Sequence, residues 1–455
     1  MREPIEFRRT LELNTDAESV FQWHVRPGAF ERLGPPWERV ELDGRAARIE
    51  PGEKQTVLFR LGPLERPWSS EITSVTPGRA FEDVQLEGPF ASWTHTHSME
   101  PAGAGSTLED KVEYTLPLGA LGSLFGGGFV RRKLDRMFAY RHRVTADDLL
   151  RHAEAGVAPM RVLVSGASGL VGRSLVSFLT TGGHEVRRLV RREPTAADEF
   201  YWNPERGGLD PKALDGVDAV VHLAGENIAG ARWSAAHKKR VLESRVTGTR
   251  TLAEAIGAHA EKPRVFVSAS AIGIHGDRGD EALNEESSAG TGFLAEVCEA
   301  WEREARVVED VRSVQLRFGV ILTPAGGALE RMLLPFQLGG GGKIGSGRQW
   351  MSWIALDDAV GAIYHAITRD SLEGAVNAVA PEPATNKDYT RTLGRVLRRP
   401  TIFPMPAFVA RLTFGELADE LLLASQKVTP TRLLDTGYRY AQPELEGALR
   451  HQLGR

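Results

Sequence analysis

Several features that often reveal a function class are scarce or missing in this sequence. One cysteine among 455 residues, Cys298, excludes an internal disulfide and fits a reducing compartment. The net charge of −4 argues against a nucleic-acid-binding protein, which is usually basic. No apolar run reaches the ~18–20 residues that span a bilayer, and the charged N-terminus lacks the apolar core of a secretory signal. We therefore expect a cytoplasmic protein with no nucleic-acid partner and no membrane span.

Glycine, in contrast, is plentiful, and one group of glycines has the spacing of a nucleotide-binding turn. The apolar run Val162–Val164 leads directly into Gly166, Gly169 and Gly172, and an apolar periodic segment follows. Such glycines permit a tight turn, close approach of the backbone to a pyrophosphate, and close packing of helix on strand. The helix N-terminus then offers free N–H groups to the phosphates. The segment predicts a dinucleotide site, to which we also assign Ser168, Leu170 and Val171.

The next predicted strand ends in two arginines, Arg191 and Arg192. NAD-binding proteins usually carry an acidic residue here for the ribose 2′-hydroxyl, whereas an arginine accommodates the 2′-phosphate of NADP. Arginine also suits a phosphate because its fork can bind two oxygens at once. We predict NADP rather than NAD as the cofactor, with a solvated basic turn as the alternative.

Other cofactor contacts are expected at the carboxyl ends of later strands, where ligands bind in open α/β sheets. Small residues there allow the backbone to approach the cofactor. The residues that we assign to this part of the site are Leu223, Ala224, Gly225, Arg245, Ser268 and Ala269.

The small, flexible segment Ala153–Pro159 suggests a domain boundary. We place one domain at residues 1–155 and a second at 160–455. The first domain shows alternating strand patterns followed by a helical pattern over Phe129–His152, which predicts a curved antiparallel sheet crossed by one long helix. Its predicted strands are Thr56–Leu61, Ser92–Met99 and Thr107–Leu116.

From Met160 onward, strand patterns alternate with helix patterns, which is typical of a doubly wound parallel sheet. We predict helices over Ser234–Gly257 and Phe293–Val308. The predicted strands are Arg161–Ser165, Glu185–Val190, Ala219–Leu223, Arg264–Ser268, Ser313–Phe318 and Ala375–Val379.

Two family resemblances follow from longer motifs. GPFASWTHTHSME and VRRKLDRMFAYRHRV in the first domain resemble the START-like (SRPBCC, polyketide-cyclase-like) superfamily, which implies an α+β helix-grip fold with an apolar ligand cavity. GASGLVG, HLAG, RVTGT and WIALDDAV resemble the extended short-chain dehydrogenase/reductase superfamily. The runs HLAGENIAGARWSAAHKKRVLESRVTGTR and FVSASAIGIHGDRGD are similar to its NAD-dependent epimerase/dehydratase subfamily, which implies a Rossmann domain with a small C-terminal substrate lobe.

The catalytic unit that this resemblance implies is incomplete. The superfamily uses a serine or threonine with Tyr-x-x-x-Lys, in which the tyrosine transfers a proton. Ser270 matches the serine, but the helix offers Phe293 or Leu294 at the tyrosine position and Val297 or Cys298 at the lysine position. No Tyr-x-x-x-Lys occurs anywhere in the sequence.

Neighbouring groups are the remaining catalytic candidates beside Ser270. His275 has a side chain that ordinarily titrates near neutrality and can serve as an acid. Glu296 can act as a base if it is partly desolvated. The structural alternatives are a loop histidine and a solvated carboxylate or ribose contact.

The C-terminal part should hold the substrate. Leu338–Gly347, LGGGGKIGSG, lies between helices, so it does not have the context of a phosphate loop and is expected to shape a cleft. Cations and aromatic rings can grip an anionic or planar substrate, although at least one tryptophan here should only pack the lobe. The substrate candidates are Arg317, Lys343, Arg348, Trp350 and Trp353, and an apolar helix is predicted over Leu412–Ser425.

In the first domain, His95 and His97 share one face of a predicted strand. Such a pair can ligate a metal, but no third ligand is evident in the sequence. We therefore predict no metal site. Both residues are interpreted either as surface residues or as lining a cavity, where they would place polar groups in an apolar pocket.

Two functions remain open at this point. One is an NADP-dependent oxidoreductase or epimerase-like enzyme that acts on a small-molecule substrate, with an apolar-ligand domain in front. The other is a non-catalytic NADP-binding sensor, which the missing Tyr-x-x-x-Lys favours. Neither the substrate nor an oligomeric state follows from the sequence.

Overall fold

The computed structural model describes residues 3–38, 40–43, 48–61, 64–117, 119–306, 308 and 310–455. The chain divides into two compact units. Unit 1 contains Met1–Gly156, Ser177–Gly183 and Gly454, and unit 2 contains Val157–Val176, His184–Leu453 and Arg455.

Unit 1 is an antiparallel sheet with strand order β1-β7-β6-β5-β4-β3-β2. The strands are β1 (Ile5–Leu13), β2 (Val40–Leu42), β3 (Lys54–Leu61), β4 (Leu64–Thr76), β5 (Ala80–Glu87), β6 (Ser92–Ala102) and β7 (Gly105–Thr115). The helices are α1 (Ala17–Val25), α2 (Ala29–Leu33) and α3 (Gly119–Ala155). The helix-grip fold predicted for this part of the chain is confirmed.

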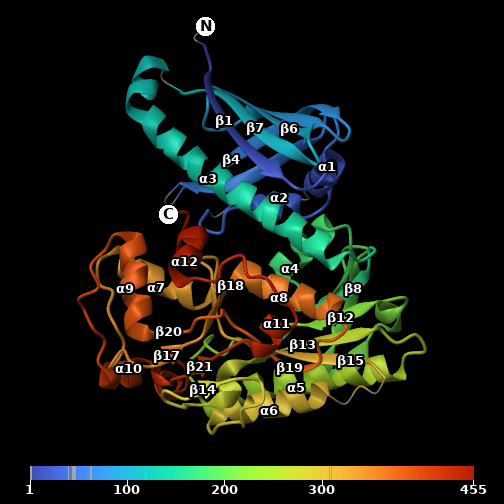
Figure 1. Cartoon of the computed structure of the whole chain (residues 1–455), viewed down its shortest axis with the longest axis vertical. Coiled ribbons are helices and arrows are strands. Elements are labelled where there is room, and N and C mark those ends of the chain that lie inside the picture. Colours follow the sequence, from blue (N-terminus) through green and yellow to red (C-terminus); the bar gives the residue numbers. More distant parts are fainter. Residues whose placement is uncertain are drawn as a thin grey trace. The chain divides into compact units, whose positions relative to one another are not determined.

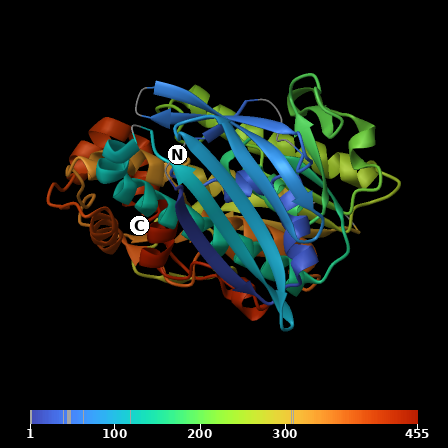
Figure 2. The same ribbon diagram turned by 90° about the horizontal axis from the view of Figure 1, so that it is seen from above.

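The sheet of unit 1 buries one face against α3, which runs along it in Figures 1 and 2. Along β6 and β7, buried side chains alternate with more exposed ones, as expected of a sheet with one covered face. Part of this core joins Phe7, Trp93 and Tyr114 of the sheet to Leu134 and Phe138 of α3. The alternation also directs His95 and His97 of β6 inward.

Unit 2 is built on a sheet with strand order β11-β10-β9-β8-β12-β13-β15-β19, parallel except where β11 pairs with β10. The strands are β8 (Arg161–Ser165), β9 (Glu185–Val190), β10 (Glu199–Asn203), β11 (Gly208–Leu209), β12 (Ala219–His222), β13 (Val265–Ala271), β15 (Arg312–Phe318) and β19 (Gly374–Ala378). The predicted doubly wound sheet is confirmed.

Helices cover both faces of this sheet. In Figure 1, α5 (Ala235–Ala258) and α6 (Phe293–Ala305) lie on one side, whereas α4 (Leu170–Thr181) and α8 (Leu356–Thr368) lie on the other. Because both faces are covered, the central strands are almost continuously apolar and buried. Short 3₁₀ turns join several elements, namely η1 (Pro204–Arg206), η2 (Pro211–Leu214) and η3 (Ile272–His275).

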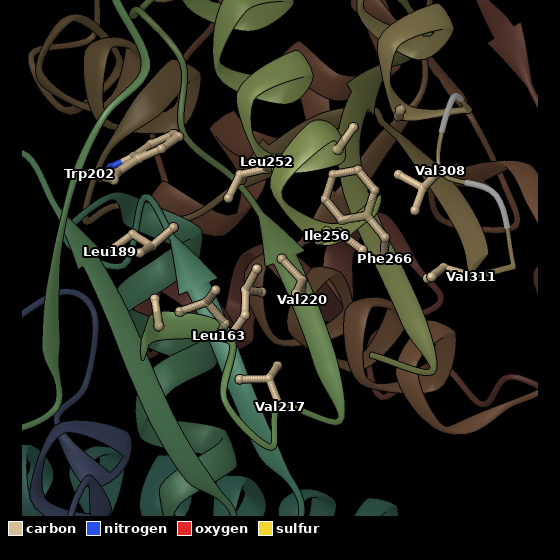
Figure 3. Close-up of a cluster of buried hydrophobic side chains, with 14 residues drawn as sticks. Leu163, Leu189, Trp202, Val217, Val220, Leu252, Ile256, Phe266, Val308 and Val311 are labelled. Atoms are coloured by element: carbon tan, nitrogen blue, oxygen red, sulfur yellow. The ribbon is translucent and has the colours of Figure 1, made fainter. Parts of the chain in front are cut away.

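The core on the α5 side of the sheet is shown in Figure 3. Leu163, Val220 and Phe266 come from three adjacent strands and pack with Leu252 and Ile256 of α5. Each such side chain contributes ~1.5–3 kcal/mol when it is removed from water. This packing holds β8 and β12 side by side, and the dinucleotide turn begins at the end of β8.

The C-terminal lobe is made of short elements around a second core that includes Leu329, Trp353 and Leu393. Its elements are β14 (Ala282–Leu283), β16 (Val320–Leu322), α7 (Gly327–Gln337), β17 (Trp350–Met351), β18 (Trp353–Ala355), β20 (Ala384–Thr385), α9 (Asn386–Leu397), β21 (Lys427–Val428), α11 (Thr431–Asp435) and α12 (Leu445–Leu453).

The continuous helix expected over Leu412–Ser425 is wrong. Helix α10 (Ala407–Phe414) stops at Gly415, whose φ of 65° is left-handed, and a π-helical turn, η4 (Ala418–Leu423), follows. Glycine accepts this conformation without steric cost, so it ends the helix despite the apolar pattern on both sides. Among the described residues, no helix combines the length and apolar character needed to cross a membrane.

Candidate functional site

The glycine turn after β8 lies where the strand order of unit 2 reverses. Strand β8 has β9 on one side and β12 on the other. The chain therefore adds β9, β10 and β11 towards one edge of the sheet, and then β12, β13, β15 and β19 towards the other edge. Ligands of open α/β sheets bind at such switch points, beyond the carboxyl ends of the strands. Leu223 and Ala224 follow β12 directly, so their loop adjoins the glycine turn at this position.

Two positions of the turn, Gly166 and Gly172, have no room for a side chain, each for a different steric reason. Gly166 has φ +71°, and a Cβ built on it would lie 2.8 Å from the backbone nitrogen of Ala224. A Cβ on Gly172 would collide with the carbonyl oxygen of Gly166. Ser168 and Gly169 are exposed at the tip of the turn. The backbone is therefore bare where α4 begins, and Leu170 and Val171 form its first turn.

The two arginines after β9 have different surroundings. The Arg192 guanidinium donates to both oxygens of Glu199, at 2.8 and 2.6 Å. These bonds, with the Thr195 N–H, lower the pKa of Glu199 to about 2. Arg191 is exposed and makes no hydrogen bond or ion pair within the described part of the chain. Only Arg191 is therefore free to bind a phosphate without breaking an existing pair.

Arg245 of α5 is buried and supports the loop after β12. Its Nη1 donates to the carbonyl oxygen of Glu226 at 3.0 Å, and its guanidinium lies 5.0 Å from the centre of the Trp301 ring. Burial lowers the pKa of Arg245. Gly225 packs directly on this guanidinium. The cofactor contact assigned to Arg245 stays a prediction; in the structure its guanidinium contacts the loop beside the glycine turn.

Ser268, Ala269 and Ser270 are all buried within β13. The Ser270 hydroxyl donates to Glu302 Oε1 at 2.8 Å. Glu302 also accepts two hydrogen bonds from Arg317, at 2.7 and 2.9 Å. Ser270 and Arg317 face each other in register on β13 and β15, so a buried network holds both side chains. The substrate role expected of Arg317 stays a prediction, since its guanidinium pairs with Glu302 and also lines a cavity.

A cavity of about 280 Å³ lies beside this network. Glu302 and Arg317 form part of its wall. Three further charged residues, on α6 or directly after it, and two apolar residues complete the wall. The complete lining is Ile274, Ala289, Glu299, Glu302, Arg303, Arg306 and Arg317.

Helix α6 has no proton-transferring pair at its inner face. Leu294 and Cys298 are buried, and burial raises the pKa of the Cys298 thiol to about 12. Phe293 is half-buried against Trp233, with ring centres 5.2 Å apart. Glu296 is exposed on the opposite face, so the desolvation that a base at this position would need is missing.

His275 is fully buried at the end of η3. Burial, with the charges of Arg317 and Arg278, lowers the pKa of His275 to about 4. The ring is therefore neutral at pH 7. The pKa near neutrality that we expected of His275 is wrong.

The other substrate candidates have separate contacts of their own. Trp353 is fully buried in the lobe core and donates its indole N–H to the Glu382 carbonyl oxygen, so a substrate contact is excluded without repacking. Lys343 donates to Ser346 within its own loop. Trp350 donates to Asp280 at 2.8 Å, and the Lys427 ammonium lies over its ring. Arg348 is exposed.

A lysine of α5 that the sequence did not reveal contacts the first residue of α6. Lys238 Nζ is 4.6 Å from the centre of the Phe293 ring, 5.9 Å from the Trp233 ring and 2.6 Å from Glu416 Oε1. Lys238 lies on α5, 55 residues before Phe293. The Tyr-x-x-x-Lys pattern covers one helix, so it carries no signal for a cation supplied by another helix.

In unit 1, the structure joins His95 and His97 to groups from three other elements. Asp83 of β5, Asp110 of β7 and His142 of α3 complete a buried His–Asp cluster with them. The third donor that the sequence did not reveal is Asp83, which pairs across the sheet with His95.

Family models match three parts of the chain. Residues 162–378 match the NAD dependent epimerase/dehydratase family, and residues 13–139 match polyketide cyclase / dehydrase and lipid transport proteins. Residues 405–452 match a domain of unknown function, DUF1731.

Curated and solved relatives resemble the chain over long stretches. Epimerase family protein Mb2239 of Mycobacterium bovis is 43% identical over 290 residues, which cover 63% of this chain and 96% of that protein. A structure described as the nucleoside-diphosphate sugar epimerase of Corynebacterium glutamicum is 34% identical with a TM-score of 0.80, covering 98% of this chain and 90% of that one. A structure of human epimerase family protein SDR39U1 (isoform 2) with NADPH is 38% identical with a TM-score of 0.61. The match covers 65% of this chain and 99% of that one.

Proposed function

The chain belongs to the NAD dependent epimerase/dehydratase family, and from that premise we propose that unit 2 binds NADP(H) at the switch point between β8 and β12. The observation that carries the cofactor choice is Arg191, a free guanidinium directly after β9. The NADPH in the human SDR39U1 structure supports the same choice.

The residues present fit this cofactor. The bare backbone of Gly166–Gly172 and the start of α4 would hold the pyrophosphate. Arg191 would bind the 2′-phosphate with charge-assisted hydrogen bonds. Arg192 would contribute less because Glu199 already occupies its guanidinium.

The test is a fluorescence titration with NADPH and with NADH. We expect wild type to bind NADPH more tightly, and R191A to weaken NADPH binding about 10- to 100-fold, the equivalent of ~1.5–3 kcal/mol for a hydrogen bond to a charged group. NADH binding by R191A should not change. R192A is the matched control: because Glu199 already occupies the Arg192 guanidinium, this variant should lose much less NADPH affinity than R191A. Equal affinity of wild type for NADH and NADPH would refute the proposal.

We further propose that the protein holds NADP(H) without the tyrosine-based proton transfer of related enzymes. Leu294 and Cys298 fill the inner face of α6, and the Ser270 hydroxyl is committed to Glu302. Such a site suits a sensor, in which the nucleotide stabilises one state of the protein and is not consumed. Wild type incubated with NADPH and a panel of aldehydes and ketones should then show no NADPH oxidation.

A second candidate, carbonyl reduction, is favoured by Lys238 alone. NADPH, when bound, supplies a hydride to a carbonyl carbon. The Lys238 ammonium lies against Phe293, one of the two positions where the family places its tyrosine, and would hold the proton that the carbonyl oxygen needs.

This second candidate predicts NADPH oxidation with at least one carbonyl compound. K238M should abolish turnover and leave the NADPH affinity unchanged. K239M is the matched control, because Lys239 is exposed and pairs only with the surface carboxylate of Glu243 among the described residues. Turnover that survives in K238M would remove Lys238 from the reaction.

A further inference from the structure

The His–Asp cluster belongs to unit 1, whereas the dinucleotide site belongs to unit 2. Its members come from β5, β6, β7 and α3, and all of them meet on the covered face of the sheet. His95 and His97 are two residues apart on β6 and therefore share a face. Asp83 lies directly opposite His95, and Asp110 lies directly opposite His97. Strand register alone therefore brings two imidazoles and two carboxylates together.

We propose that Asp83, His95 and His97 form a binding site for a divalent transition metal of the zinc type. One donor atom from each of these residues lies within 4.8 Å of the other two. Asp83 Oδ1 and His95 Nδ1 are 3.5 Å apart. Bonds of ~2.0–2.2 Å to tetrahedral zinc place neighbouring donors about 3.4 Å apart, which matches this spacing.

The second ring nitrogen of His95 is already held as a metal-binding histidine requires. His95 Nε2 is 3.0 Å from Asp110 Oδ1. A ligating histidine almost always donates its other N–H to a carboxylate or carbonyl, which fixes the ring and its tautomer. Asp110 is positioned in turn by His142, whose Nε2 is 2.6 Å from Asp110 Oδ2. Asp110 and His142 thus orient His95 while its Nδ1 faces Asp83.

His97 adds a second observation at this cluster. Its Nδ1 is buried and forms no hydrogen bond among the described residues, although Asp110 Oδ1 is 2.7 Å away. A buried polar atom without a hydrogen bond is costly and rare in native proteins. The imidazole is only 3.9 Å from that of His95, measured between ring centres. A cation bound between the rings would give His97 Nδ1 a bond in place of this poorly aligned contact.

The donor set also indicates the kind of metal. Two imidazole nitrogens and one carboxylate oxygen suit zinc and its neighbours better than magnesium or calcium, which prefer oxygen donors. Three protein ligands leave a fourth position for water or for a small ligand, as in catalytic zinc sites. The Asp83 side chain is 19% exposed and provides a route for the ion to enter.

The experiment is a calorimetric titration of the full-length protein with ZnCl₂ after treatment with a chelator. We expect wild type to bind one equivalent at this site. D83N and H97N should weaken that binding at least 100-fold, and H142N should weaken it about 10- to 100-fold, as outer-shell changes usually do. H259N is the matched control, since the His259–Asp215 pair is another His–carboxylate contact outside the cluster.

Two further measurements separate loss of the site from loss of the fold. Cobalt(II) bound to wild type should give the visible absorption of a tetrahedral site, and D83N should lose it. The NADPH affinity of every variant should equal that of wild type, which shows that unit 2 is intact. Absence of stoichiometric zinc binding in wild type, or wild-type affinity in D83N, would overturn the proposal and leave only a hydrogen-bonded cluster.

Discussion

Gly172 shows how strictly the dinucleotide turn is specified at the level of one residue. It lies near the start of α4, where the helix crosses the backbone of Gly166 and Ala167. Any side chain there meets backbone atoms, which cannot rotate away as a flexible side chain can. The geometry of the turn therefore depends on the absence of a single methyl group.

We expect G172A to lose ~1–3 kcal/mol of unfolding free energy, because overpacking displaces α4 from β8. The same displacement should abolish NADPH binding. G257A is the control: a Cβ at Gly257 of α5 meets nothing within 4 Å, so the higher helix propensity of alanine should stabilise the protein by up to ~1 kcal/mol. Urea denaturation measures both, and a neutral G172A would contradict the packing argument.

Glu302 is the centre of a buried hydrogen-bond network in unit 2. It is 1% exposed and accepts hydrogen bonds from Ser270, Arg306 and Arg317. Loss of one partner from a buried ion pair is costly because it leaves the other charge uncompensated. The network therefore stabilises the junction of β13, β15 and α6.

E302Q should reduce the unfolding free energy by ~3–5 kcal/mol, since Arg317 would remain charged and buried without a carboxylate. E299Q, on the exposed side of the same helix, should change it by less than ~0.5 kcal/mol. Chemical denaturation of both variants tests this difference. A small effect of E302Q would mean that Arg317 finds another acceptor.

At the scale of elements, α6 depends on the C-terminal lobe for its N-terminus. The helix starts after Gly292 without a capping side chain from its own segment. Glu420 of η4 supplies the acceptor instead, with oxygens 3.1 and 3.2 Å from the N–H nitrogens of Phe293 and Leu294. A carboxylate here also interacts favourably with the helix dipole.

E420A should cost ~0.5–2 kcal/mol, as the loss of an N-cap does. Hydrogen exchange should become faster at the first turn of α6. D419A is the matched control, because Asp419 forms a surface ion pair with Arg411 that is worth at most ~1 kcal/mol. Unchanged exchange at residues 293–296 in E420A would show that the contact does not stabilise the helix.

Element by element, sequence reasoning succeeded where the hydrophobic pattern is strong. Strands β8 and β9 have the predicted bounds. Strand β8 carries an unbroken buried apolar run, Val162–Val164, as a central parallel strand should. Strand β10 was missed, since Glu199–Asn203 is short and mixes polar and aromatic residues. The break at Gly415 was missed because apolar spacing continues across it.

The parts of the site that escaped prediction depend on partners far away in the chain. Lys238 and Phe293 are brought together only by the packing of α5 and α6. Asp83, Asp110 and His142 become neighbours of His95 only through strand register and the position of α3. A sequence shows which groups are present, but such pairings require the tertiary fold.

At the scale of the whole molecule, stability should depend on pH through buried histidines of unit 2. Burial, with the charge of Arg245, lowers the pKa of His222 to about 3, and the pKa of His275 is about 4. Unfolding returns both to an ordinary value of ~6.5, so the unfolded state binds more protons between these limits. The contribution of these two neutral histidines to the unfolding free energy is therefore fully present above pH ~6.5, and it is lost as the pH falls towards 4.

We expect the unfolding free energy to fall by up to ~3 kcal/mol per pH unit between pH 6 and 4.5 on account of these two groups. Denaturation curves at several pH values measure the slope. H222N and H275N should each reduce the slope by up to ~1.4 kcal/mol per pH unit, whatever their effect on absolute stability. An unaltered slope in both variants would refute the assignment.

Cys298 has a practical consequence at this scale. The one thiol of the chain is 3% exposed on α6, and its raised pKa keeps it protonated and unreactive at neutral pH. A cysteine introduced at any exposed position would be the only group to react with a maleimide or a spin label. The protein is therefore ready for site-specific labelling without a cysteine-free background, and a probe can be attached to either unit to follow its response to nucleotide or zinc.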